Sequence, residues 1–396
     1  CMPIPMGIVK KAAVWLFGKP ITINFNGDDA VEKDLLRAWK LNKMDTKLVQ
    51  LAIDGGVEGN VVLKFTYDEL ASIPLKFQVL SATTKVKFFY DPHDTDKLLM
   101  ARIQYPYMDP SNGKWYWYRE EWTEDKEIHY IPIEATNVAL KDRAYAIAAN
   151  PFHPAIEPNK EWTISDVKPN NFGVIPVFNI KNWNNGTQFG QGDLFDLTRI
   201  IDRINLTYHL IDGSNQLEIN PLKAFIDLEP MEGDSIDVPA KPGGSVSLAS
   251  TETEDGVPKS GKIEIIESNQ KIKESMFNYA NELKNMLFDA TGSVFPRQDQ
   301  ITNKGALTQS VVQQIYAPLI ETVGEKRKAY GTNGICEFLT LVVRGLANLG
   351  VKPYTNLKNV KLGDEKLEAK ITWFAELTMS EDEKFAAFDR IDRGIK

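Results

Sequence analysis

Cysteine and histidine are scarce in this chain. Its 396 residues include only two cysteines and four histidines. These residues are Cys1, Cys336, His93, His129, His153 and His209. The cysteines are too far apart for a metal-ligand spacing or a disulfide framework, which favours a reducing compartment. No two histidines have the helical spacing that zinc hydrolases use, so no metal site is predicted.

Motifs for phosphate binding or catalysis are also missing. The glycine-rich stretch 54–60 precedes a predicted strand, whereas a phosphate-binding loop follows a strand and opens a helix. The acidic pairs Asp28-Asp29 and Glu120-Glu121 have no further ligand cluster nearby in sequence, and such pairs are common on surface turns. Cys336 lies among apolar neighbours and is predicted to be a small core residue. The sequence therefore predicts a protein that is not an enzyme and has no cofactor.

Long apolar runs are absent as well. The longest candidate, residues 8–17, contains two lysines and is shorter than the roughly 20 apolar residues that cross a bilayer. No small-residue cleavage site follows it, so it does not resemble a signal peptide. No membrane partner is expected.

The charge balance is acidic, with 46 basic and 54 acidic side chains and a net charge of -8. A protein that grips nucleic acid needs clustered cations to neutralise phosphates. An acidic wall instead repels the DNA backbone and keeps it centred in a channel. The charge therefore disfavours a DNA-gripping protein and leaves a DNA conduit open.

The first third of the chain changes from helical to strand periodicity. Apolar spacing predicts helices over 8–16, 28–42 and 46–53, the last ending before Gly55-Gly56. Runs rich in β-branched and aromatic residues then predict antiparallel strands. These strands are 61–65, 84–90, 98–105 and 114–122. Because Asn112-Gly113 is a strong turn signal, the last two strands are predicted to form a hairpin.

Aromatic residues are concentrated in that hairpin. They are Tyr105, Tyr107, Trp115, Tyr116, Trp117, Tyr118 and Trp122. Aromatic faces can stack on nucleic-acid bases. Aromatic residues on both faces of a hairpin more often pack a sheet core or a subunit contact, and the neighbouring charges are net acidic. The packing interpretation is preferred.

Two apolar-striped helices flank an acidic insert. After a predicted buried strand at 174–178, a helix is expected from Asp193, a candidate N-cap, to 219, and another from 269 to 291, closed by Gly292. The insert between them has strand candidates at 222–228, 245–249 and 262–267. An antiparallel helical pair carrying a β-rich tip is predicted.

A polar loop follows the second of these helices. A long helix is then expected over 307–349, interrupted at Pro318 and Gly331, and Pro318 should kink it. A strand at 368–377 and a charged helix from Ser380 complete the expected α+β fold.

The order of these motifs resembles that of phage portal proteins, the head-to-tail connectors. Gly18-Lys19-Pro20 after the first helix, and Phe172 to Val177 before the helical pair, are similar to family patterns. Gly192-Asp193-Leu194, followed by Ile201-Asp202-Arg203-Ile204-Asn205, is the most specific similarity. Gly305-Ala306-Leu307 resembles the helix start that follows the family's tunnel loop.

The resemblance implies a portal fold with a helical stem, a β-rich wing subdomain, a small α/β clip and a long kinked wing helix. The implied domains are 1–192 wing, 193–219 stem helix, 220–268 clip, 269–291 stem helix, 292–306 tunnel loop, 307–379 wing, and 380–396 the start of a crown or C-terminal helix. The tunnel loop implies a DNA-facing set. These residues are Val294, Phe295, Arg297, Gln298, Asp299, Ile301, Asn303 and Lys304. Partner binding by the clip would involve Glu252, Glu254 and Asp255.

The resemblance also implies a homo-oligomeric ring, usually a dodecamer, at a unique capsid vertex of the virion, assembled in the host cytoplasm. Double-stranded DNA would pass through its channel during packaging and ejection. The implied partners are large terminase, head-completion or tail proteins, scaffold and capsid protein. The alternatives are another ring-forming head or tail structural protein, and an enzyme whose residues come from distant segments.

Overall fold

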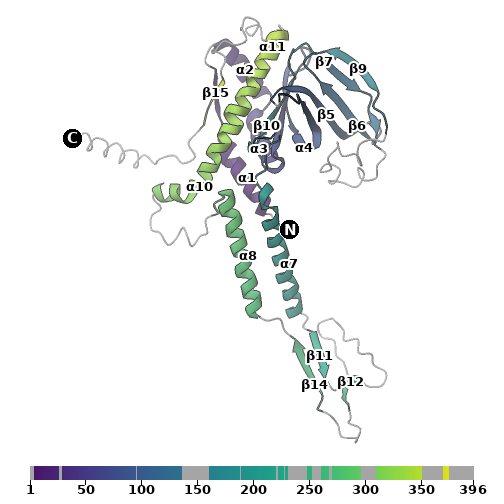
Figure 1. Ribbon diagram of the computed structural model, residues 1–396, viewed down its shortest axis with the longest axis vertical. Coiled ribbons are helices and arrows are strands. Elements are labelled where there is room, and N and C mark those ends of the chain that lie inside the picture. The colour runs from purple at the N-terminus through teal and green to yellow at the C-terminus, as the bar shows by residue number, and fades with distance from the viewer. Residues whose placement is uncertain are drawn as a thin grey trace, which may run out of the picture. The chain divides into compact units, whose positions relative to one another are not determined.

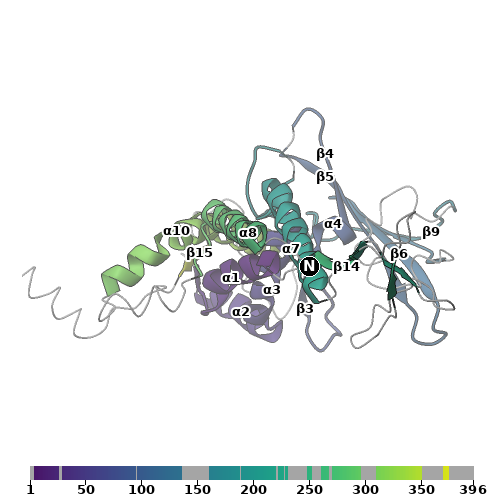
Figure 2. The same cartoon turned by 90° about the horizontal axis from the view of Figure 1, so that it is seen from below.

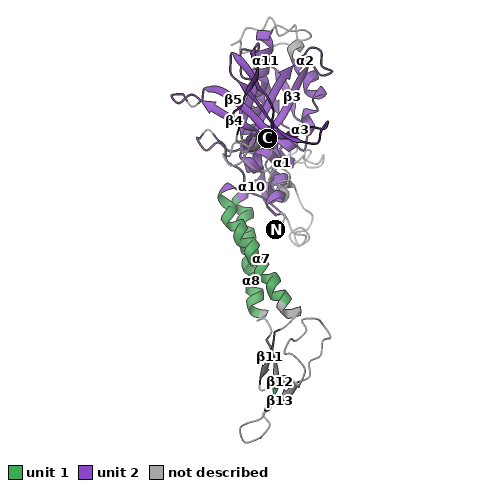
Figure 3. Cartoon of the chain, turned by 90° about the vertical axis from the view of Figure 1, so that its right-hand side faces the viewer, with its two compact units in different colours: residues 1–3, 196–290 green, residues 4–195, 291–396 purple. Residues whose placement is uncertain are grey.

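The structure is a computed structural model with two compact units (Figure 3). It describes residues 4–25, 29–94, 96–135, 160–187, 189–219, 222–226, 228–230, 248–251, 260–266, 270–295, 309–349 and 369–373. We call the unit formed by 4–195 and 291–396 the body, and the unit containing 196–290 the helical-pair unit. Helices and sheets are mixed, as the predicted α+β class requires (Figure 1).

Three helices and a short strand begin the body. They are α1 (Ile4–Phe17), β1 (Thr22–Phe25), α2 (Asp29–Leu41) and α3 (Met44–Glu58), and the helices gather together in Figure 2. α3 does not end before Gly55-Gly56, as the sequence suggested, but continues to Glu58, and Gly59, with a φ of 84°, caps it. The prediction treated the two glycines as helix breakers, and their packing explains why the helix tolerates them.

A three-stranded antiparallel sheet follows, in the order β10-β2-β3. Its strands are β2 (Asn60–Tyr67), β3 (Leu75–Ser81) and β10 (Val177–Lys181). β3 was missed in the sequence. The strand expected at 174–178 begins at Val177, directly after Pro176, which has no N–H to donate to a ladder. The sheet is deeply buried at Val61, Leu63 and Phe65.

The second sheet of the body has six strands, with the order β4-β5-β6-β7-β9 and β8 paired to β6. The strands are β4 (Val86–Tyr90), β5 (Leu98–Met108), β6 (Trp115–Trp122), β7 (Lys126–Tyr130), β8 (Ile133–Glu134) and β9 (Ile164–Pro169), and α4 (Ala82–Lys85) leads into β4. β5 and β6 form the predicted hairpin, and Gly113 has the positive φ of 68° that its turn needs.

The hairpin aromatics pack within the protein. Trp117 and Trp122 are buried, and Tyr105 faces Tyr118 across the strands with ring centroids 5.2 Å apart. These contacts favour the packing interpretation over a base-stacking platform.

A long helical stretch completes the core of the body. It consists of α10 (Gln309–Arg327), the π-helical segment η2 (Lys328–Cys336) and α11 (Glu337–Leu349). β15 (Ala369–Thr372) then pairs antiparallel with β1. The interruption predicted at Gly331 is this widened π-helical segment, and Pro318 lies inside α10. Cys336 is buried in the core, as predicted.

The helical-pair unit consists of α7 (Thr198–Ile219) and α8 (Gln270–Thr291), which lie side by side in Figures 1 and 3. The connecting segment contains two small antiparallel sheets. β11 (Leu222–Ile226) pairs with β14 (Lys262–Ile266), and β12 (Leu228–Pro230) pairs with β13 (Leu248–Ser250). The chain thus forms two long helices with a β-containing insert, in the order that the sequence predicts.

Candidate functional site at the segments flanking the helical pair

A buried ion pair fixes the segment that leads into α7. The Lys326 ammonium, from the end of α10, lies 2.7 Å from the Asp193 carboxylate. Trp183 Nε1 and Asn182 Nδ2 also donate hydrogen bonds to Asp193, at 2.9 and 2.8 Å. The carboxylate therefore has charged and neutral donors, which a buried charge requires.

Asn182 connects this ion pair to η2. Its side-chain oxygen accepts hydrogen bonds from the Tyr330 hydroxyl at 2.8 Å and from Lys326 at 3.1 Å. Its amide group donates to Asp193 and to the carbonyl of Gln191. Asn182 is fully buried, and each of its side-chain polar atoms has a partner. We call Asn182, Trp183, Asp193, Lys326 and Tyr330 the Asp193 network.

The two glycines of α3 make room for this network. A Cβ on Gly55 would lie 2.0 Å from the Tyr330 hydroxyl, and a Cβ on Gly56 would lie 2.8 Å from an Asp193 carboxylate oxygen. The Asp193 N–H also donates to the carbonyl of Gly56 at 2.8 Å. Gly55-Gly56 is thus a close-approach site within a helix, because only a residue without a side chain fits there.

Burial dominates the electrostatics of the network. It lowers the pKa of Lys326, and the adjacent Asp193 carboxylate opposes that shift. Burial also raises the pKa of Tyr330 well above its ordinary value, and the negative charges of Asp193 and Asp54 raise it further. The arrangement holds a charge pair in place, and its donors and acceptors are occupied by one another.

The role predicted for Asp193 as a helix N-cap is wrong. The 3-10 turn η1 (Phe195–Leu197) intervenes, and α7 begins at Thr198. Sequence reasoning also missed Lys326, although a signal was present. Lys326 continues the buried stripe of Leu319 and Val323 at helical spacing, where a lysine needs a buried partner.

The segment that follows α8 is fixed by other contacts. Gly292 has a φ of 61°, so it ends the helix in the left-handed conformation, as expected of a closing glycine. The Lys11 ammonium donates to the carbonyl of Val294 and lies 4.3 Å from the centre of the Phe295 ring. Burial lowers the pKa of Lys11. Val294 packs against the body core, whereas Phe295 is 42% exposed.

The other predicted site residues lie outside the described residues. They are Arg297, Gln298, Asp299, Ile301, Asn303 and Lys304 of the predicted tunnel loop, and Glu252, Glu254 and Asp255 of the predicted clip. Their DNA-facing and partner-binding roles stay predictions.

A second polar cluster lies between the sheets of the body. Glu120, Glu127 and His129 have ligand-type atoms within 4.8 Å of one another. Glu120 and Glu127 also line a cavity of about 350 Å³. The Lys64 ammonium contacts Glu120, and the Tyr118 hydroxyl donates to it at 2.8 Å. His129 Nε2 lies 2.6 Å from a Glu127 oxygen. These contacts pair Glu120 with the buried Lys64 and connect the half-buried Glu127 and His129 to each other.

The adjacent carboxylates Glu120 and Glu121 point to opposite faces of β6, because side chains alternate along a strand. Glu121 is held by Arg102 at 2.7 Å, by Arg119 at 2.8 Å and by the Tyr130 hydroxyl at 2.9 Å. The two carboxylates therefore cannot share a metal ion.

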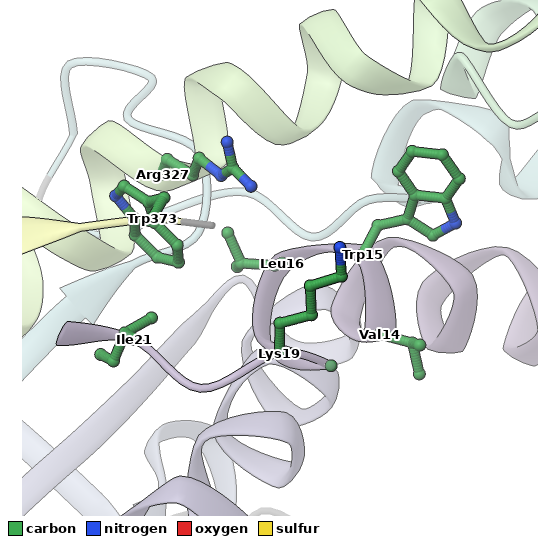
Figure 4. Close-up of a pocket in the computed structure, with 8 residues that line it drawn as sticks. Val14, Trp15, Leu16, Lys19, Ile21, Arg327 and Trp373 are labelled. Carbon is green, nitrogen blue, oxygen red and sulfur yellow. The ribbon is translucent and has the colours of Figure 1, made fainter. Parts of the chain in front are cut away.

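An apolar pocket of about 240 Å³ lies beside the end of α1 (Figure 4). Trp15, Leu16, Ile21 and Trp373 line it. The Arg327 guanidinium carbon lies 5.1 Å from the centre of the Trp373 ring.

Among the described helices, none is both long and apolar enough to cross a lipid bilayer.

The fold and these contacts define an α+β protein in which both segments flanking a long helical pair are fixed in the body. Comparison with known families makes the class specific. A family model described as phage portal protein, SPP1 Gp6-like, matches residues 2–391. The chain belongs to this family of portal proteins, a structural family that associates with the capsid as an oligomeric ring, and it has a portal function at a capsid vertex.

No curated protein sequence matches the chain. One similar solved structure is titled "Virion of native gene transfer agent (GTA) particle". It is 14% identical, with a TM-score of 0.40, and the match covers 98% of this chain and 85% of that one.

Proposed function

We propose that copies of this chain form a ring, of twelve subunits, at the unique vertex of a phage capsid. Double-stranded DNA moves through the ring during packaging and ejection. Large terminase docks during packaging, head-completion or tail proteins dock afterwards, and the ring assembles with scaffold and capsid protein in the host cytoplasm. The family match over nearly the whole chain carries this proposal.

The described residues support this assignment in two ways. α7 and α8 supply two 22-residue helices that can serve as a stem, with the β-containing insert as a clip. The net charge of -8 suits a wall past which DNA slides. In this proposal the wing comprises 1–192 and 307–379, the tunnel loop 292–306, and residues 380–396 the start of a crown or a C-terminal helix.

Electron micrographs of the purified chain test the ring. We expect rings with a central hole, and image classes that distinguish twelve subunits from thirteen. Protein that stays monomeric at every concentration tested would contradict the proposal. Rings that never join terminase, but join tail components, would favour the alternative of another ring-forming head or tail protein.

The tunnel loop is tested by removing its cations. A few cations around a channel make weak phosphate contacts whose strength falls steeply with salt, which permits sliding. We expect Arg297→Ala combined with Lys304→Ala to alter the salt dependence of in vitro DNA packaging. Lys328→Ala, at an exposed lysine of η2, is the matched control. Unchanged packaging in this double variant and in a deletion of 299–303 would refute the role of the loop.

The clip is tested by reversing its charge. Changing Glu252, Glu254 and Asp255 together to lysine should weaken the binding of terminase or of a head-completion protein, while rings still form. Pull-down assays with each partner provide the measurement. Unaltered binding of both partners would remove these residues from the docking surface.

A further inference from the structure

The helical pair buries few of its large apolar side chains. Among the side chains of the pair that the structure describes, the buried ones are Ile204, Thr207, Ile211, Ala280, Leu283 and Leu287. Six other large apolar side chains in the described part of the pair are between 40% and 58% exposed. They are Leu206, Leu210, Ile272, Phe277, Tyr279 and Met286. Exposed apolar residues on this scale mark a surface that is covered in the assembled protein.

Most of these residues lie on one broad face of the pair. Leu206 and Leu210 are four residues apart on α7, and Ile272, Tyr279 and Met286 follow one another at intervals of seven on α8. Because Arg203, three residues before Leu206, contacts the Tyr279 hydroxyl at 3.4 Å, the two rows border the same side of the pair. We call these five apolar residues face A.

The opposite face is different. On that side the Lys284 ammonium lies 5.4 Å from the centre of the Tyr208 ring, which connects the two helices. Ile201 precedes Tyr208 by seven residues and Phe277 precedes Lys284 by seven, so both lie on this side. Phe277 is 40% exposed, and Ile201 and Tyr208 are half-buried. We call Ile201, Tyr208 and Phe277 face B.

We infer that face A of one copy packs against face B of the next copy. Contact between two copies of face A would give a closed dimer in which both copies of face B stay exposed. A head-to-tail contact covers both faces of every copy, and repeated head-to-tail contacts generate rings. Each face runs along 22-residue helices, so the helical pair of a neighbouring copy has the same length as the face that it would cover. This inference rests on the proposed ring and specifies which surfaces build it.

Charge substitutions on the two faces test the contact. Leu210→Asp alters face A, and Phe277→Asp alters face B. Asn285→Asp is the matched control, because Asn285 is exposed and lies opposite the buried Leu283 and Leu287 on α8. Light scattering after size-exclusion chromatography and electron micrographs give the assembly state, and circular dichroism reports folding.

We expect wild type and Asn285→Asp to form rings, and each face variant alone to be monomeric. An equimolar mixture of the two face variants should give a dimer of one copy of each, and no ring. In that dimer the intact face B of Leu210→Asp meets the intact face A of Phe277→Asp. Homodimers of one variant alone, or rings formed by both variants, would overturn the assignment and leave the proposed ring standing.

A photo-crosslinking amino acid at position 277 provides a second measurement that leaves the fold intact. We expect a ladder of covalent multimers beyond the dimer, with the adducts mapped to face A. A ladder that stops at the dimer, or adducts confined to other surfaces, would overturn the inference. Failure of wild type to form rings would instead refute the proposed function.

Discussion

Replacing Lys326 with methionine should test the Asp193 network most directly. Lys326 is 2% exposed, and its ammonium contacts both Asp193 and Asn182. Methionine keeps most of the side-chain volume but removes the positive charge, so the buried carboxylate of Asp193 loses its counterion. Breaking a buried ion pair in this way costs about 3–5 kcal/mol.

The control substitution and the double mutant separate this effect from general damage. Lys328→Met is the same change two residues away, where the ammonium is exposed beside Glu325, and it should cost less than about 0.5 kcal/mol. Asp193→Asn combined with Lys326→Met removes both charges together. We expect the double variant to lose less unfolding free energy than the two single variants lose together. The difference, which is the coupling energy, should be about 2–3 kcal/mol.

Urea unfolding followed by tryptophan fluorescence and circular dichroism provides the measurement. The fluorescence comes from eight tryptophans, one of which, Trp183, donates to Asp193, so it reports on unfolding of the chain. For Lys326→Met we also expect a fall in Tm of roughly 6–10 °C. Equal stability of Lys326→Met and Lys328→Met, or additive effects in the double mutant, would refute the reasoning that the ion pair holds this segment.

Two further predictions concern α3 and the core. Gly55→Ala should destabilise the body by about 2 kcal/mol or more in the same urea assay, because the new Cβ would meet the Tyr330 hydroxyl. Gly213→Ala, a helical position with nothing within 4 Å of its Cβ, should instead stabilise by about 0.5–1 kcal/mol, and equal effects would contradict this account. Burial raises the pKa of Cys336 to about 11, so iodoacetamide at pH 8 should modify it only after unfolding, as mass spectrometry of its peptide would show. Rapid labelling of the native protein would contradict its burial.

Patterns that depend on neighbouring residues were predictable from the sequence. The spacing of apolar residues predicted α7 and α8, because amphipathic helices place every third or fourth residue on one side. Asn112-Gly113 predicted the hairpin of β5 and β6, and Gly292 predicted the end of α8, because each depends on local backbone conformation. The order of these local features was enough to indicate the portal family.

The roles of residues that lie far apart in the chain depend on how the chain packs in three dimensions. Gly55 looked like a helix end, and its actual role required Tyr330, which lies far along the chain, to pack against it. Asp193 has the residue type and the position along the chain of an N-cap, but its partner is the buried Lys326, 133 residues away. Short-range residue spacing was enough to predict the local elements and their order, because each element depends on its neighbours along the chain. The three-dimensional packing determined the Asp193 network and the two unlike faces of the helical pair, since burial and pairing depend on residues that the sequence separates.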